Sequence, residues 1–307
     1  MAHNKADSNS MPLLECNDTA CDGTKNEQSV SKPIEIYSFI DPLCPECWGL
    51  EPILKKLQTL YGNYISIVYF IGRKLSTVNC CKNNQIGQLK EHIELAKQWE
   101  KTASRSGMSC DGDLWLENPI SSPLAASLAI KAAEFQGRKA AARFLRKIRE
   151  FLFLAKQNIS EKSVLLECAE MANLDVNEFE KDLHSERALK AYQCDLKICS
   201  EMDVQEYPSL VFFSKNVEEA GIKVTGMYSF DVYLDIIAEV LNEQPIKTEP
   251  PSLEDFLKKY HFVATKEISV VYDLSTECVE NEMKKLVLKQ IAERVPVKYG
   301  TFWRYKE

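Results

Sequence analysis

The sequence predicts an α/β fold, and three observations carry this prediction. The motif Cys44-x-x-Cys47 lies between Ile34–Ile40, a short β-branched and aromatic run typical of a strand, and Leu50–Leu57, whose apolar residues recur at helical spacing. A further β-branched run, Tyr64–Ile71, completes a strand–helix–strand unit, which implies two parallel strands joined by a right-handed crossover. Much later in the chain, a proline directly precedes a third apolar run.

A Cys-x-x-Cys motif at the junction of a strand and a helix is the thioredoxin-type redox signature. The unpaired N–H groups and the positive dipole end of the helix favour a thiolate on Cys44, and Cys47 can close a disulfide with it one turn later. Thioredoxin folds place a cis-proline opposite the dithiol, and Pro208, just before the run Leu210–Phe213, fits that position. The sequence therefore predicts a thioredoxin-like fold with a redox-active site of Cys44, Cys47 and Pro208.

Zinc binding is the competing interpretation of a Cys-x-x-Cys motif, because such a pair can be half of a metal site. A second half-site would need another close cysteine pair, and few pairs in this chain come near. Residues 1–32 are rich in Asn, Asp, Ser, Thr and Lys, which predicts a disordered tail. Within this tail Cys16, Cys21 and His3 are candidate zinc ligands, and two solvated thiols are the alternative.

With 307 residues the chain is long enough for about two domains. Its net charge of -7 and isoelectric point near 5.4 provide no general attraction to nucleic acid or to an anionic membrane. No run approaches the length that spans a bilayer, and Met1–Ser10 lacks the apolar region of an export signal. Because 11 cysteines without an export signal indicate a reducing compartment, we expect a cytoplasmic protein.

A long helical block separates the two halves of the thioredoxin pattern. After the second strand, residues from about 73 to 205 are predicted to form successive amphipathic helices. In one of the last of these, Leu189, Tyr192 and Leu196 are expected to point inward. Two strands and a helix then resume the pattern. A helical insertion at this place is the DsbA arrangement, so the predicted domain of residues 33–245 resembles the DsbA family.

Glu46, which lies between the two cysteines, affects how oxidising such a dithiol can be. Its carboxylate disfavours a thiolate on Cys44 and so opposes the helix dipole. A strong oxidant stabilises its reduced thiolate form, and this sequence lacks a basic or neutral group for that purpose at this position. We therefore predict a weaker oxidant than the exported DsbA proteins.

A proline-rich linker precedes a second, smaller predicted domain, residues 246–307. Two helices, Leu253–Tyr260 and Ser275–Gln290, and a terminal β-hairpin resemble a winged helix, with Thr265–Asp273 left unassigned between the helices. A winged helix that binds nucleic acid needs a basic face. From Glu249 onward the chain carries ten Lys+Arg and ten Asp+Glu, which favours a role in protein interaction or packing over DNA binding.

The stretch Asp41–Trp48, with the sequence DPLCPECW, is more specific than the Cys-x-x-Cys motif within it. Together with Leu50–Pro52 it closely resembles the SpxH (YjbH) family of ClpXP adapter proteins of low-GC Gram-positive bacteria. Two C-terminal segments, Ala264–Ile268 and Glu282–Leu286, carry the same resemblance, which covers residues 34 to about 305.

The resemblance implies a cytoplasmic, non-enzymatic adapter that binds the transcription regulator Spx and presents it to the protease ClpXP. In that family, adapter binding lowers the level of Spx in unstressed cells, and disulfide stress relieves the degradation. The Cys-x-x-Cys pair is there a candidate redox sensor and not an established catalyst, and the Cys/His-containing tail is linked to zinc. Contact with ClpXP is expected to be indirect or transient, and neither nucleic acid nor a membrane is an expected partner.

An adapter needs a surface for its partner, and two aromatic residues next to the predicted redox site are candidates. Trp48, beside the second cysteine, and Tyr207, before the proline, are expected to form an aromatic rim; core packing of the helix start is the alternative for Trp48. A cytosolic DsbA-type thiol–disulfide oxidoreductase, with the dithiol as catalyst, is the alternative function. A kappa-type glutathione transferase or isomerase is disfavoured, because that group usually carries Ser where Cys44 stands.

Overall fold

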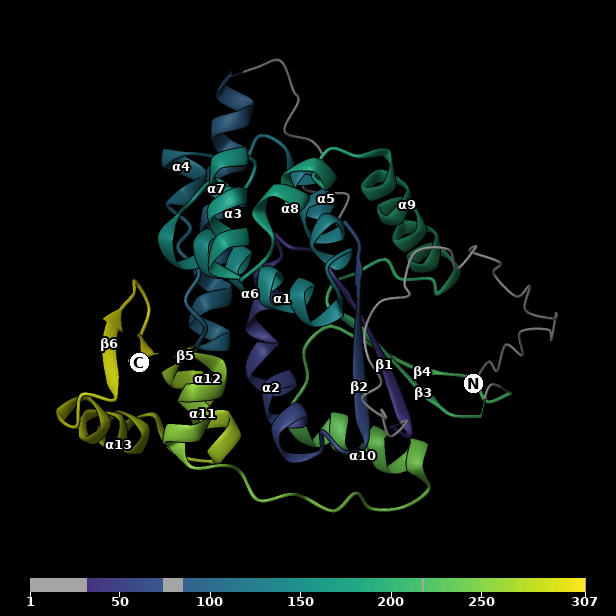
Figure 1. Ribbon diagram of the computed structural model, residues 1–307, viewed down its shortest axis with the longest axis vertical. Helices are drawn as coiled ribbons and strands as arrows, with labels where there is room; N and C mark the ends of the chain where they lie inside the picture. The colour runs from purple at the N-terminus through teal and green to yellow at the C-terminus, as the bar shows by residue number, and fades with distance from the viewer. Residues whose placement is uncertain (1–31, 74–84, 217, 307) are drawn as a thin grey trace. The chain divides into compact units, whose positions relative to one another are not determined.

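A four-stranded mixed sheet lies at the centre of the first part of the chain. The structure, a computed structural model, describes residues 32–73, 85–216 and 218–306, and Lys32–Glu307 belong to one compact unit (Figure 1). The sheet has the order β2-β1-β3-β4, in which β1 is parallel to β2 and the other pairs are antiparallel. The strands are β1 (Ile34–Ile40), β2 (Ile65–Ile71), β3 (Ser209–Ser214) and β4 (Ile222–Thr225). The predicted α/β class and parallel strand pair are confirmed.

Apolar side chains of β1 point to both faces of the sheet, and each face has its own buried core. Ile34 and Ile36 join the cluster on the face covered by α2 (Glu51–Leu60) and α10 (Phe230–Leu241). Phe39 belongs to the larger cluster on the opposite face, which the inserted helices complete. Side chains of a strand point alternately to its two faces, so a sheet buried on both faces needs apolar residues at both sets of positions.

Helices occupy the described chain between β2 and β3, as predicted. One of them, α6, buries Phe144, Ile148 and Leu152 along one face, which is the amphipathic pattern expected for a helix on a core. None of the helices in the described ranges is both long and apolar enough to cross a membrane. The inserted helices are α3 (Gln85–Ser106), α4 (Leu114–Glu117), α5 (Pro123–Glu134), α6 (Arg138–Ala155), α7 (Lys162–Met171), α8 (Val176–Asp182) and α9 (Glu186–Glu201).

The inward face of α9 differs from the prediction. Tyr192 is buried as expected, but Leu189 and Leu196 are 40% and 38% exposed. The inward face instead includes Asp195, whose carboxylate accepts the Ile71 N–H at 2.8 Å and pairs with the Lys131 ammonium at 2.8 Å. A buried charge needs such partners. Because a paired aspartate takes the place of an apolar residue, the apolar spacing alone identifies the wrong face.

The C-terminal segment, residues 246–306, adds a second sheet to the described chain. Its three strands are antiparallel in the order β5-β7-β6. Its helices and strands bury their own cluster, which includes Phe256, Ile268, Met283 and Trp303. The two predicted helices and the hairpin are present, the unassigned stretch forms a helix, and a short strand directly precedes it. The winged-helix assignment and the domain boundary at 245/246 stay predictions. The elements are α11 (Leu253–Tyr260), β5 (Phe262–Ala264), α12 (Thr265–Tyr272), α13 (Thr276–Leu288), β6 (Ala292–Pro296) and β7 (Thr301–Tyr305).

The C-terminal segment packs on the helix that follows the dithiol. Helix α12 lies against α2 (Figure 1). The linker before it is fixed to the end of α2, since the Thr248 N–H donates to the Leu60 carbonyl at 2.9 Å. Phe302 of β7 and Ala264 of β5 are part of the same buried cluster as Cys47. The C-terminal segment therefore completes the core around the predicted redox site.

Candidate redox and interaction site

Cys44 begins the short helix α1 (Pro45–Gly49) as its N-cap residue. Its sulfur accepts the Cys47 N–H at 3.4 Å and donates to the Tyr207 carbonyl at 3.5 Å. Pro45 occupies the first helical position, where the missing N–H costs nothing. The side chain is half-buried. Free N–H groups at a helix N-terminus stabilise a thiolate, so the position of Cys44 is the one that a reactive first cysteine requires.

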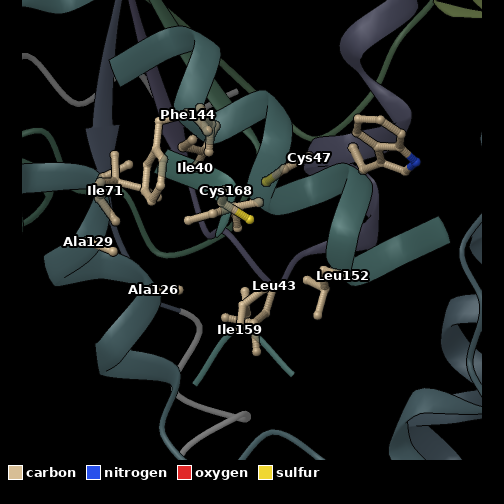
Figure 2. Close-up of a cluster of buried hydrophobic side chains, with 14 of the residues drawn as sticks. Ile40, Leu43, Cys47, Ile71, Ala126, Ala129, Phe144, Leu152, Ile159 and Cys168 are labelled. Carbon is tan, nitrogen blue, oxygen red and sulfur yellow. The ribbon is translucent and has the colours of Figure 1, made fainter. Parts of the chain in front are cut away.

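Cys47 lies in the interior, within the apolar cluster that contains Ile40, Phe144 and Cys168 (Figure 2). It is 1% exposed. Burial raises the pKa of the Cys47 thiol well above its ordinary value, and the neighbouring Cys44 raises it further. A buried, protonated thiol is a poor nucleophile toward an external molecule. The arrangement therefore allows attack by Cys44 and closure of a disulfide by Cys47.

Pro208 follows a cis peptide bond from Tyr207, so the predicted cis-proline is confirmed, and the Tyr207 carbonyl lies 3.5 Å from the Cys44 sulfur. The Pro208 carbonyl accepts the Gly226 N–H at 2.7 Å, which ties the proline loop to the end of β4. The Tyr207 ring lies directly on Gly72. A Cβ atom at position 72 would come within 2.1 Å of the tyrosine hydroxyl, so only glycine leaves room for the ring there. The structure thus brings Cys44, Cys47 and Pro208 together.

The carboxylate of Glu46 is paired in the structure. Its oxygen lies 2.6 Å from the Arg105 guanidinium at the end of α3. An opposite charge at this distance offsets part of the field that Glu46 exerts on the neighbouring cysteine. The sequence alone does not suggest this partner. The predicted weakness of the dithiol as an oxidant therefore stays a prediction, and Arg105 reduces its physical basis.

The predicted aromatic rim is wrong. Trp48 is 0% exposed and Tyr207 is 6% exposed, so neither ring is available to a partner on the folded surface. For Trp48 the alternative of core packing holds. Its indole N–H donates to the Ser109 carbonyl at 3.0 Å. The physical reason for Trp48 is that Phe302 of the C-terminal segment lies on its ring, and Tyr207 is buried against Gly72.

Three groups from distant parts of the chain enclose Trp48. The Phe302 ring of β7 stacks on it with centroids 6.3 Å apart and planes 2° from parallel, and the Phe153 ring of α6 lies at 5.8 Å. The Arg146 guanidinium carbon lies 4.5 Å from the centroid of the indole, within range of a cation–π interaction. The residue next to the buried cysteine is therefore held by both the insertion and the C-terminal segment.

Arg146 also belongs to a buried ionic cluster that joins three parts of the chain. Glu267 of α12, fully buried, accepts hydrogen bonds from the two Arg146 Nη atoms at 2.8 and 2.9 Å and pairs with Lys55 of α2 at 2.7 Å. The Ala264 N–H donates to the same carboxylate at 2.7 Å. Burial alone would raise the pKa of Glu267, but Arg146 and Lys55 outweigh burial and lower it to about 2. The C-terminal segment is thus docked through a charged group that has all its partners.

A carboxylate cluster lies where the hairpin turn of the C-terminal segment meets the insertion. Oxygens of Glu100, Asp111 and Asp113 lie close enough together to hold a cation. The Lys298 ammonium occupies this position, at 2.7, 3.0 and 2.8 Å from them. Burial disfavours the ammonium, but the three carboxylates outweigh it and raise the pKa of Lys298. The cluster therefore provides a second set of ion pairs that hold the C-terminal segment against the insertion.

The predicted zinc ligands Cys16, Cys21 and His3 lie outside the described residues, and so does the predicted tail of residues 1–32 apart from its last position. Zinc binding at these residues stays a prediction.

The cysteines provide a direct test of this geometry. We expect iodoacetamide to modify exposed Cys194 and Cys278 and half-buried Cys44 in the folded protein, whereas the buried cysteines react only after unfolding. Burial raises the pKa of Cys168 to about 12 and that of Cys199 to about 11, so both remain thiols at about pH 9. Timed alkylation followed by peptide mass spectrometry measures the order. Modification of Cys47 before Cys44 would contradict the site. The protected set is Cys47, Cys110, Cys168 and Cys199.

Comparison with known proteins separates the fold from the family. A family model described as thioredoxin matches residues 37–235. The cytosolic disulfide reductase DsbM from Pseudomonas aeruginosa has a similar structure, with a TM-score of 0.51 and 17% identity over 68% of this chain and 97% of that one. A protein named a probable DsbA oxidoreductase, from Streptomyces coelicolor, has a TM-score of 0.52 and 15% identity over 72% of this chain and 93% of that one. These structures establish the thioredoxin-like, DsbA-type fold and nothing further.

Curated relatives match both parts of the chain. The ClpXP adapter protein SpxH of Halalkalibacterium halodurans is 50% identical over 100% of this chain and 100% of its own length. The ClpXP adapter protein SpxH of Bacillus subtilis is 52% identical over 89% of each chain. The full-length match includes the C-terminal segment, which lies beyond the thioredoxin match. On this evidence the chain belongs to the SpxH family of ClpXP adapter proteins.

Proposed function

We propose that this protein is a cytoplasmic, non-enzymatic adapter that binds the regulator Spx and promotes its degradation by ClpXP in unstressed cells, with relief under disulfide stress. The observation that carries the proposal is the 50% identity with an adapter named for ClpXP along the whole chain. Similarity confined to residues 37–235 would support only the fold. Contact with ClpXP is indirect or transient in this proposal.

The site geometry is consistent with an adapter. An oxidoreductase must present its dithiol and an adjoining surface to a substrate protein. Here the C-terminal segment covers Trp48 next to the dithiol, through Phe302 and the buried Glu267. Trp48 is therefore in contact with the chain's own C-terminal segment and not with solvent. The dithiol keeps the geometry for disulfide formation, which suits a sensor as well as a catalyst.

Degradation of purified Spx by ClpXP in reducing buffer tests the proposal. We expect a stoichiometric amount of this protein to accelerate the loss of Spx severalfold. Cys44→Ala is expected to leave this acceleration intact, since an adapter acts by binding, and Cys278→Ala is the matched control because that exposed cysteine lies far along the chain in α13. Absence of acceleration, with turnover of a disulfide substrate instead, would establish the oxidoreductase alternative.

A further inference from the structure

A groove forms where the C-terminal segment meets the thioredoxin-like part. Its volume is about 530 Å³, within the range of sites that bind small ligands or a few side chains. One wall is the junction of α1 and α2 with Pro52 and Ile53, the second is the segment Met227–Phe230 that leads into α10, and the third is α12. The groove exists only because α12 lies beside α2, so it belongs to the assembled protein and not to either part.

Part of the groove lining is apolar and could accept an apolar side chain of a partner. Ile53, Met227 and Val270 contribute to it, and Tyr228 beside them is 50% exposed. Gly49 also lines the groove, and a Cβ atom at this position would come within 2.9 Å of Ser106 and 3.2 Å of Met227. A half-exposed aromatic ring over an apolar recess is typical of positions that anchor a partner side chain.

The charge of the groove is set by Lys266. The other two cations of the lining have partners, since Lys56 pairs with Asp273 and Arg105 pairs with Glu46. Within residues 32–73, 85–216 and 218–306, no group forms an ion pair or hydrogen bond with the Lys266 ammonium. Its aliphatic stem is positioned against Gly107, where a Cβ atom would come within 3.1 Å of it. One uncompensated positive charge therefore lies beside an apolar recess on a protein whose net charge is -7.

We infer that this groove binds a segment of the client protein that carries an apolar side chain next to a carboxylate. The apolar side chain lies against Ile53, Met227 and Tyr228, and the carboxylate pairs with Lys266. The inference rests on the proposed function, because it assigns the client-binding site of the adapter. An acidic segment is the complementary occupant, since a basic one would bring a like charge to Lys266.

Charge reversal at one position tests the inference. Lys266→Glu is expected to weaken the binding of purified Spx at least tenfold, by fluorescence anisotropy in low salt, and the loss is expected to shrink as salt is added. Tyr228→Ala is expected to weaken binding by a similar factor without salt dependence. Lys284→Glu is the matched control, because it makes the same charge change on exposed α13, away from the groove.

The outcomes are distinguishable. If the unaltered protein does not bind Spx, the proposed function is overturned and the inference with it. If it binds, and both Lys266→Glu and Tyr228→Ala bind as tightly as Lys284→Glu, the groove is not the site and the adapter function stands. Loss of binding in both groove variants, with an unchanged melting temperature, supports the inference. The unchanged melting temperature excludes a loss that comes from unfolding.

Discussion

Glu267→Gln is expected to lower the free energy of unfolding by about 3–5 kcal/mol, the usual cost of removing one partner from a buried ion pair. The carboxylate is fully buried and neutralises Arg146 and Lys55. Glutamine keeps the volume but removes the carboxylate that pairs with Lys55 and one of those that pair with Arg146, which keeps Glu150 at 2.7 Å. Its amide group also cannot accept every hydrogen bond that the carboxylate accepts. Since the three residues lie on different parts of the chain, the loss is expected to loosen the C-terminal segment first.

Urea unfolding followed by circular dichroism measures this effect. Glu282→Gln is the matched control, because Glu282 pairs with the exposed Lys285 one turn along α13. Exposed pairs of this kind contribute about 0.3–0.5 kcal/mol. Equal midpoints for the two variants would show that the buried cluster contributes nothing net to stability.

The same carboxylate gives the unaltered protein a predictable dependence on pH. The pKa of Glu267 is lowered from 4.5 to about 2 in the folded state. A lowered folded-state pKa means that the contribution is complete above pH 4.5 and is lost as the pH falls toward 2. The loss amounts to roughly 3 kcal/mol for this group. In Glu267→Gln the corresponding part of the acid transition is expected to disappear, which a comparison of urea midpoints between pH 6 and pH 3 measures.

Trp48→Ala is expected to cost about 3–5 kcal/mol, because it removes a large buried ring and leaves a cavity. The ring contacts Phe302, Phe153 and Arg146, so the cavity opens where the insertion and the C-terminal segment meet. Trp48→Phe is expected to cost less, since it retains an aromatic ring but leaves the Ser109 carbonyl without its donor at 3.0 Å. Thermal and urea unfolding measure both variants.

Leu288→Ala is the control for Trp48→Ala, because Leu288 is 84% exposed and surface changes of this kind usually alter stability by no more than about 0.5 kcal/mol. A Trp48→Ala protein that is as stable as this control, but defective in binding Spx, would contradict the core-packing role and indicate that Trp48 contacts the partner. Loss of binding in proportion to loss of folded protein is the expected result.

Local sequence was sufficient to predict the centre of the fold. The cysteine motif between a β-branched run and an apolar-periodic run gave β1 and the helix after it, and the proline before an apolar run gave the cis bond at Pro208. Each of these depends on neighbours within a few residues. Helix α12 is harder, since Val270, Val271 and Tyr272 have strand preferences. Burial of Ile268 and Val271 in the C-terminal core overrides those preferences.

The parts that sequence reasoning missed depend on partners far apart in the chain. Glu267 finds Arg146 and Lys55 across more than a hundred residues, and no local pattern marks either pair. Trp48 looks like a surface residue next to a reactive cysteine until Phe302 is placed over it. Asp195 can similarly point inward because the Lys131 ammonium and the Ile71 N–H pair with its carboxylate. In each case the missing information is a tertiary contact, and a single sequence contains no direct record of it.

The order of these contacts along the chain also determines how the protein matures during synthesis. Ile36 cannot pair with Phe212 until the whole insertion has left the ribosome, and long-range pairing of this kind is slow to form. Glu267, which pairs with Arg146 and Lys55, and Phe302, which stacks on Trp48, emerge later still. Until then the nascent chain carries an indole without its Phe302 contact and a Lys55 without the Glu267 carboxylate. A product that stops short of Phe302 therefore lacks the last contact over Trp48, which makes it a natural target for chaperones and quality-control proteases.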